Sequence, residues 1–195
     1  MGNNASVRRK LEHIGAESVI SGNPDVLSKC DRLILPGVGH FGRAVGELRQ
    51  TGLWDWLDHE VRVRKKPTLG ICLGMQLMAR YSEEGRVEGF GWLEATVTRF
   101  AIADTARYKV PHIGWNEVVL RKPSLLFDGV PERSLFYFVH AYHMVCTDSE
   151  DVLGVSTYER PFVAAVCRDN VMGLQCHPEK SQDVGEIVLK NFTVL

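Results

Sequence analysis

Cys72 stands in the stretch PTLGICLGMQLM (67–78), between Gly70 and Gly74. An apolar, β-prone run precedes the cysteine and a helix-forming run follows it, which predicts a strand that turns sharply into a helix with the thiol at the junction. The amino end of a helix favours thiolate over thiol, and the backbone N–H of Leu73 would point at a reacting carbonyl as an oxyanion donor. The position indicates a nucleophile. A buried structural cysteine is the alternative when Cys72 is taken alone.

His177 is the histidine whose neighbours suit a general base. It follows the predicted strand 171–176, and Glu179 comes two residues later. Residues two apart in an extended segment point the same way, and Pro178 is expected to prevent a helix and keep this segment extended. Glu179 can therefore orient the His177 ring and stabilise its protonated form. Zinc at this point would lack further ligands at sensible spacing, so we expect no metal site.

The other histidines carry no comparable signal. His112 and His143 are predicted to lie in polar loops, and His140 ends a predicted strand beside a pocket. A third candidate element is the glycine-containing turn PGVGHFG (36–42), which follows a strand. Glycines there permit backbone angles closed to other residues, so the turn can aim amide N–H groups at an anion as a second oxyanion donor.

The elements that must position these residues alternate between helix and strand in the first half. The expected helices are 6–15, 42–50, 53–63 and 73–80, and the expected strands are 17–20, 31–35 and 67–72. This alternation predicts a parallel sheet with helices on its faces. The second half predicts short strands in antiparallel pairing and a closing helix: 94–100, 117–120, 134–142, 152–158, 162–167 and 171–176, then 184–192. We expect one α/β domain over residues 1–195.

Composition excludes several classes of protein. The formal net charge is −1 and no arginine-rich stripe occurs, which argues against a nucleic-acid partner. No apolar run is long enough to span a bilayer, so we expect no membrane partner. Five cysteines without a C-x-x-C pair favour reduced thiols in the cytoplasm. The start MGNNAS fits a myristoylation pattern, but a turn at Gly2 before a helix is the preferred interpretation.

GICLGMQ, the turn PGVG and the terminal HPE resemble the signatures of the class I (triad) glutamine amidotransferases. LILPGVG, GICLGMQLM with SEEG, KVPHIGWN, YFVHAY, FVAAV and GLQCHPEKS also occur in the order found in glutaminase subunits of imidazole glycerol phosphate synthase. PHIGWN (111–116) separates these subunits from other class I glutaminases. The resemblance covers residues 2–193 and implies a flavodoxin-like mixed sheet flanked by helices.

The resemblance implies a role for each matching residue. Cys72 would attack the side-chain amide of L-glutamine, with His177 as base and then acid, and Glu179 would hold His177. Leu73 and the turn of Gly37 and Val38 would form the oxyanion hole. No cofactor is implied.

Four residues match positions that bind the substrate: Gln76, Glu84, Ala141 and Tyr142. Ala141 replaces the hydroxyl residue that the family usually has there. If that hydroxyl contacts glutamine, the affinity for glutamine should fall; if backbone groups make the contact, Ala141 is tolerated. Cys176 replaces the usual Phe before the catalytic histidine and brings a second thiol near the site.

The implied partner is a (β/α)₈ cyclase subunit in a heterodimer of histidine biosynthesis, which would receive the ammonia. Lys180, Trp115 and Asn116 are expected to face it. Three alternatives remain: a glutaminase that serves another synthase, a thiol hydrolase acting alone on γ-glutamyl peptides, and a non-catalytic scaffolding subunit.

A doubly wound sheet is expected to begin with a strand before its first helix, and the family has one. Met1 falls within the turn that follows that strand, so the strand is missing from the chain. We therefore expect that Met1 is an internal methionine and that an apolar strand lies upstream.

Overall fold

The computed structural model describes residues 3–195. Two expectations fall on residues outside this range: the turn or myristoylation pattern at Gly2, and the internal position of Met1. Within residues 3–195 the first element is the helix α1 (Asn4–His13).

The strands that carry the candidate nucleophile and base lie together in the main sheet. Its order is β1 (Leu33–Gly37), β2 (Thr68–Cys72), β12 (Val171–Leu174), β11 (Arg160–Arg168), β9 (Tyr142–Cys146), β5 (Leu93–Arg99), β3 (Ala79–Ser82) and β4 (Val87–Glu88). β2 pairs in parallel with β1 on one side and β12 on the other. All five β2 residues are buried, as expected of a central parallel strand. The three carboxyl ends therefore meet at one edge of the sheet.

The second half adds antiparallel strands, as predicted. β10 (Val152–Tyr158) pairs with β11 and with β7 (Val119–Leu120). β6 (His112–Glu117) and β8 (Leu135–His140) form a separate two-stranded sheet. His112, in PHIGWN, was expected to lie in a polar loop, and this prediction is wrong because residues 112–117 pair with β8.

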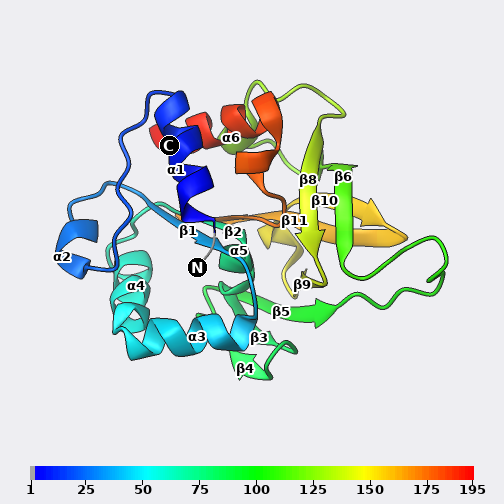
Figure 1. Cartoon of the computed structure of the whole chain (residues 1–195), viewed down its shortest axis with the longest axis horizontal. Coiled ribbons are helices and arrows are strands. Elements are labelled where there is room, and N and C mark those ends of the chain that lie inside the picture. The colour runs from blue at the N-terminus through cyan, green and yellow to red at the C-terminus, as the bar shows by residue number, and fades with distance from the viewer. Residues whose placement is uncertain (1–2) are drawn as a thin grey trace.

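Helices cover both faces of the main sheet (Figure 1). α1 and α6 (Gln182–Val194) lie on one face, and α3 (Phe41–Gln50) and α4 (Leu53–Arg62) lie on the other. Each pair buries its own apolar cluster against the sheet: Val7 and Phe192 belong to one, Phe41 and Leu48 to the other. Shorter helical pieces are α2 (Pro24–Leu27), α5 (Leu73–Gln76), η1 (Leu125–Phe127), η2 (Ser149–Asp151) and η3 (Pro178–Lys180). No helix of the described chain has the length and apolar character needed to cross a membrane.

Most predicted elements are confirmed, and four differ. The strand expected over 117–120 is divided between Glu117, which ends β6, and the short strand β7. The helix expected over 73–80 ends at Gln76, because Ala79 begins β3 and pairs with β5. The strand expected over 134–142 is divided at Ala141 into β8 and β9. Residues 17–20 form no strand, and Val19 and Ile20 are 49% and 47% exposed.

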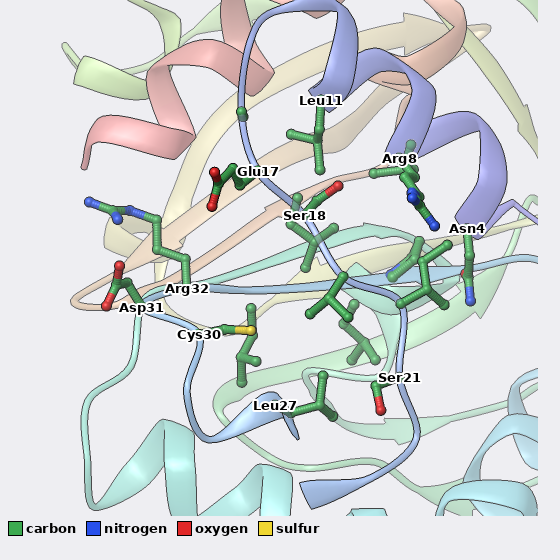
Figure 2. A pocket seen from close by; sticks show the side chains of 18 of the residues that line it. Asn4, Arg8, Leu11, Glu17, Ser18, Ser21, Leu27, Cys30, Asp31 and Arg32 are labelled. Atoms are coloured by element: carbon green, nitrogen blue, oxygen red, sulfur yellow. The ribbon is translucent and has the colours of Figure 1, made fainter. Parts of the chain in front are cut away.

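The segment 17–20 lies apart from β1 across a cavity of about 720 Å³. The cavity is lined by side chains of α1, of residues 16–21 and of β1, and Figure 2 shows Leu11 of α1 and Leu27 of α2 at opposite ends of it. In the described chain β1 pairs only with β2, so its other edge is open. A strand needs a neighbour for its backbone groups, which explains why residues 17–20 remain irregular.

Candidate active site

Cys72 lies at the turn between β2 and α5, where the sequence placed it. Its backbone has φ 54° and ψ −108°, a conformation that L side chains rarely adopt. Such strain persists only where the surroundings impose it. Gly70 is part of that constraint, because a Cβ atom there would lie 2.6 Å from the carbonyl carbon of Gly74. The packing of α5 on β2 therefore demands a small residue two positions before the cysteine.

His177 and Glu179 lie at the same edge of the sheet, just beyond β12. His177 Nδ1 is 2.7 Å from Glu179 Oε1, and both residues are buried. The expected partnership is present, but its expected cause is wrong: Pro178 begins the 3₁₀ turn η3 instead of keeping the segment extended. Proline suits the first position of a helical turn because that position needs no N–H donor.

The electrostatics of His177 favour its protonated ring. Burial lowers the pKa of His177, but interactions with Cys72 and Glu179 outweigh burial and raise that pKa from 6.5 to about 9. Nε2 of His177 has no hydrogen-bond partner of standard geometry among residues 3–195. The ring is therefore held through Nδ1 by Glu179, and Nε2 stays available for proton transfer with the neighbouring sulfur.

The turn after β1 packs against the start of α5. Gly37 is the register partner of Cys72, and a Cβ atom on Gly37 would lie 3.0 Å from Leu73 Cβ and 3.2 Å from Gly74 N. Gly39 has φ +111°, and Val38 is 36% exposed. The predicted oxyanion residues are thus adjacent, and their role as donors stays a prediction.

Two of the four predicted substrate residues already use their side-chain polar groups within the protein. Gln76 is buried and its Nε2 donates to the Tyr142 carbonyl oxygen at 2.9 Å. Glu84 Oε2 accepts from Phe41 N at 2.7 Å at the start of α3. Ala141, between β8 and β9, accepts from Phe100 N through its carbonyl oxygen. Gln76, Tyr142 and Ala141 lie close together, and substrate binding by all four stays a prediction.

The predicted partner residues lie on and beside the two-stranded sheet. Lys180 Nζ lies 5.6 Å from the ring centroid of Tyr137. Trp115 is 42% exposed and packs edge-to-face on the same ring at 5.6 Å between centroids. Asn116 differs, because its Nδ2 donates to the Thr157 carbonyl oxygen at 2.8 Å and so points toward β10.

Two polar side chains that contact the side chains of Cys72 and Glu179 were missed from the sequence. Asn3, at the start of α1, donates from Nδ2 to Glu179 Oε1 and makes no capping bond to its own helix. Gln175 donates from Nε2 to Cys72 Sγ at 3.6 Å. These contacts join segments 103 and 176 residues apart, so no local pattern reveals them.

The second thiol near the site is shielded from solvent. Cys176 is fully buried, and burial raises its pKa well above the usual range. It therefore stays a neutral thiol and does not compete as a nucleophile. Within residues 3–195 no cluster of three or more His, Cys, Asp or Glu side chains could hold a metal ion.

The family model described as "Glutamine amidotransferase class-I" matches residues 1–194 of the chain. Imidazole glycerol phosphate synthase subunit HisH 2 of Pseudomonas aeruginosa is 43% identical over 195 residues, which cover 100% of this chain and 96% of that protein. The HisH protein of Sulfurimonas denitrificans, which carries the same synthase name, is 46% identical over 198 residues and covers 99% of this chain and 93% of its own.

Solved structures support the fold. A crystal structure of a glutamine amidotransferase matches with a TM-score of 0.70 at 19% identity and covers 97% of this chain and 93% of its own. A glutamine amidotransferase from Thermotoga maritima matches with a TM-score of 0.58, at 19% identity over 92% of this chain and 67% of its own.

Proposed function

The chain belongs to the class I glutamine amidotransferases, and from that membership we propose that Cys72, His177 and Glu179 release ammonia from L-glutamine. The observation that carries the proposal is the strained position of Cys72 beside a buried His177 that Glu179 holds at 2.7 Å. A binding module would gain nothing from keeping a cysteine at unfavourable backbone angles.

The reaction divides into two acyl transfers. The Cys72 proton passes to His177 Nε2, and the sulfur forms a bond to the side-chain carbonyl carbon of glutamine. The carbonyl oxygen gains charge and accepts hydrogen bonds from the Leu73 N–H and from the turn of Gly37 and Val38. His177 then returns its proton to the amide nitrogen, the C–N bond breaks and ammonia leaves. Water attacks the thioester, with His177 again as base, and glutamate and the free thiol are restored.

Gln76, Glu84, Ala141 and Tyr142 hold the amino-acid end of the substrate in this proposal. Both N–H groups of the Gln76 amide are donated to protein acceptors, the Tyr142 carbonyl and Gln175 Oε1. Its Oε1 is left as an acceptor, which suits an α-ammonium group.

The chain acts as the glutaminase subunit of imidazole glycerol phosphate synthase, in histidine biosynthesis. Relatives that carry this subunit name are 42–47% identical over nearly the whole chain. We assign residues 1–195 to one domain. We also assign the protein to the cytoplasm, where thiols stay reduced.

The partner in this proposal is a (β/α)₈ cyclase that takes up the ammonia. Support comes from the outer face of the two-stranded sheet, where the apolar side chains of Ile113, Trp115 and Leu135 are 60%, 42% and 52% exposed. An apolar face of this kind, with Lys180 beside it, is suited to a protein partner.

The test compares the two nitrogen donors of the complete synthase. Cys72→Ala should abolish glutamine-dependent synthesis and leave synthesis from ammonium salts intact, because the cyclase chemistry lies in the partner. Glutamine-dependent activity in the Cys72→Ala protein would overturn the assignment. Ammonia release by the isolated chain at the full rate of the complex would instead favour a hydrolase that acts alone.

A further inference from the structure

Gln175 is a completely buried polar residue that the reaction described above does not use. It follows β12 and precedes Cys176 and His177, so it lies at the edge of the sheet where β2 ends. Its amide donates from Nε2 to Cys72 Sγ at 3.6 Å, and its Oε1 accepts from Gln76 Nε2 at 3.0 Å.

The orientation of the Gln175 amide follows from a backbone acceptor. The carbonyl oxygen of Tyr142 can only accept, so Gln76 must present its NH₂ group there, at 2.9 Å. The second N–H of that group then meets Gln175 Oε1. A flipped Gln175 would place two NH₂ groups against each other. Its Nε2 is therefore fixed toward the sulfur of Cys72.

The nucleophile needs such a donor because α5 is short. A helix macrodipole is a sum over aligned peptide units, and α5 contains four residues, Leu73–Gln76. The charged and titratable groups around the sulfur are His177, with Glu179 behind it, and the neutral Cys176; His140 adjoins His177. Gln175 adds a neutral donor to this set, and a hydrogen bond to the charged form of a group favours that form.

We infer that Gln175 is a positioning residue that holds the Cys72 sulfur in line and stabilises it as a thiolate, and that it ties this sulfur to the substrate-binding Gln76. The inference rests on the proposed role of Cys72. Substrate contact at Gln76 thereby orders the amide that faces the nucleophile.

The test measures how alkylation of Cys72 by iodoacetamide depends on pH in the full chain, with the Cys72 peptide followed by mass spectrometry. Gln175→Met keeps the volume and removes the donor, so the midpoint of the profile should rise by about one pH unit. Gln175→Glu keeps an acceptor for Gln76 and turns a carboxylate toward the sulfur, so its midpoint should rise at least as far. The kcat/KM for glutamine should fall about tenfold in both.

Thr68→Val is the matched control. Thr68 is completely buried on β2, four residues before Cys72, and its hydroxyl donates to the Lys66 carbonyl instead of the sulfur. This variant should leave the alkylation midpoint unchanged. An unchanged midpoint in folded Gln175→Met or Gln175→Glu protein overturns the inference, and the Glu variant decides if the Met variant does not fold. Survival of glutamine-dependent activity in Cys72→Ala overturns the proposed function instead, so the two failures are distinct.

Discussion

A Cβ atom on Gly74 would lie 1.6 Å from the carbonyl oxygen of Leu35. The first turn of α5 therefore rests directly on the backbone of β1. This contact fixes the end of β1, including Gly37, beside the cysteine that ends β2. The spacing of glycines around Cys72 thus sets the distance between this cysteine and the turn that is predicted to supply oxyanion donors.

Gly74→Ala should lower the free energy of unfolding by at least about 3 kcal/mol, because both colliding atoms belong to the backbone and neither side can yield cheaply. Gly46→Ala is the control: Gly46 lies inside α3 with nothing within 4 Å of its added Cβ, so it should stabilise by about 0.5–1 kcal/mol. Urea unfolding measures both. Near-native stability of Gly74→Ala would contradict the packing described.

Glu179→Gln should reduce glutamine-dependent activity by about 10²–10⁴-fold, because an amide can present the wrong group to His177 Nδ1 and cannot stabilise the imidazolium. Ammonium-dependent synthesis is the internal control and should not change. The pKa of His177, measured by NMR, should also fall below about 9, since Glu179 is one of the groups that raise it. An unaltered His177 titration would show that Glu179 does not act through the ring.

A pair of buried histidines should make stability sensitive to acid. His140 Nδ1 donates to the Tyr142 carbonyl at 2.8 Å, so its Nε2 accepts from His112 Nδ1 at 3.3 Å and both rings are neutral. Burial lowers the pKa of His112 to about 4 and that of His140 to about 3. The unfolded chain binds these protons below about pH 6.5 and the folded chain does not, so stability must fall as pH drops from about 6.5 to about 3.

Each histidine contributes a slope of up to about 1.4 kcal/mol per pH unit in that window. His112→Phe should flatten the dependence between pH 6.5 and 4, as measured by urea unfolding at several pH values. His13→Gln, at a side chain that is 71% exposed, should leave the slope unchanged. Parallel curves for wild type and His112→Phe would contradict the prediction.

Trp115→Ala should weaken binding of the proposed cyclase partner about tenfold or more. Trp115 and Tyr137 are register partners on the outer face of the two-stranded sheet, and exposed tryptophans at the centre of an interface carry much of the binding energy. Titration calorimetry with the purified partner gives the Kd. Val63→Ala, at a side chain that is 67% exposed beyond α4, is the control and should bind normally.

The positions of Cys72, His177 and Glu179 were predictable because each stands in a short local pattern: Cys72 between glycines at a strand end, and Glu179 two residues after His177. Gln175 was not, since its partner Cys72 is 103 residues away. The same holds for the fold. The strands 67–72 and 171–176 were found although they pair across about 100 residues, because each is a continuous apolar run. The segment 17–20 also has β-prone residues but no neighbour to pair with, and propensity alone does not make a strand.

The open edge of β1 leads to the last prediction. Val19 and Ile20 are about half exposed across the cavity from that edge, and β-prone apolar side chains near unpaired strand groups promote association between chains. Val19→Lys with Ile20→Lys should slow aggregation several-fold, measured by light scattering during mild heating, because lysines hinder edge pairing. The free energy of unfolding should change by no more than about 0.5 kcal/mol per site, since neither side chain is buried.

The matched control is Val63→Lys with Leu125→Lys, at side chains that are 67% and 70% exposed on other elements. Both double variants change the formal net charge from −1 to +1 by adding two lysines, so a general charge effect would slow aggregation equally in both. If aggregation slows equally in both double variants, the open edge of β1 is not its cause. A clear loss of stability in the Val19 and Ile20 variant would mean that these side chains are packed, and the edge would then be covered in solution. Slower aggregation in that variant alone, at unchanged stability, is the result that the open edge requires.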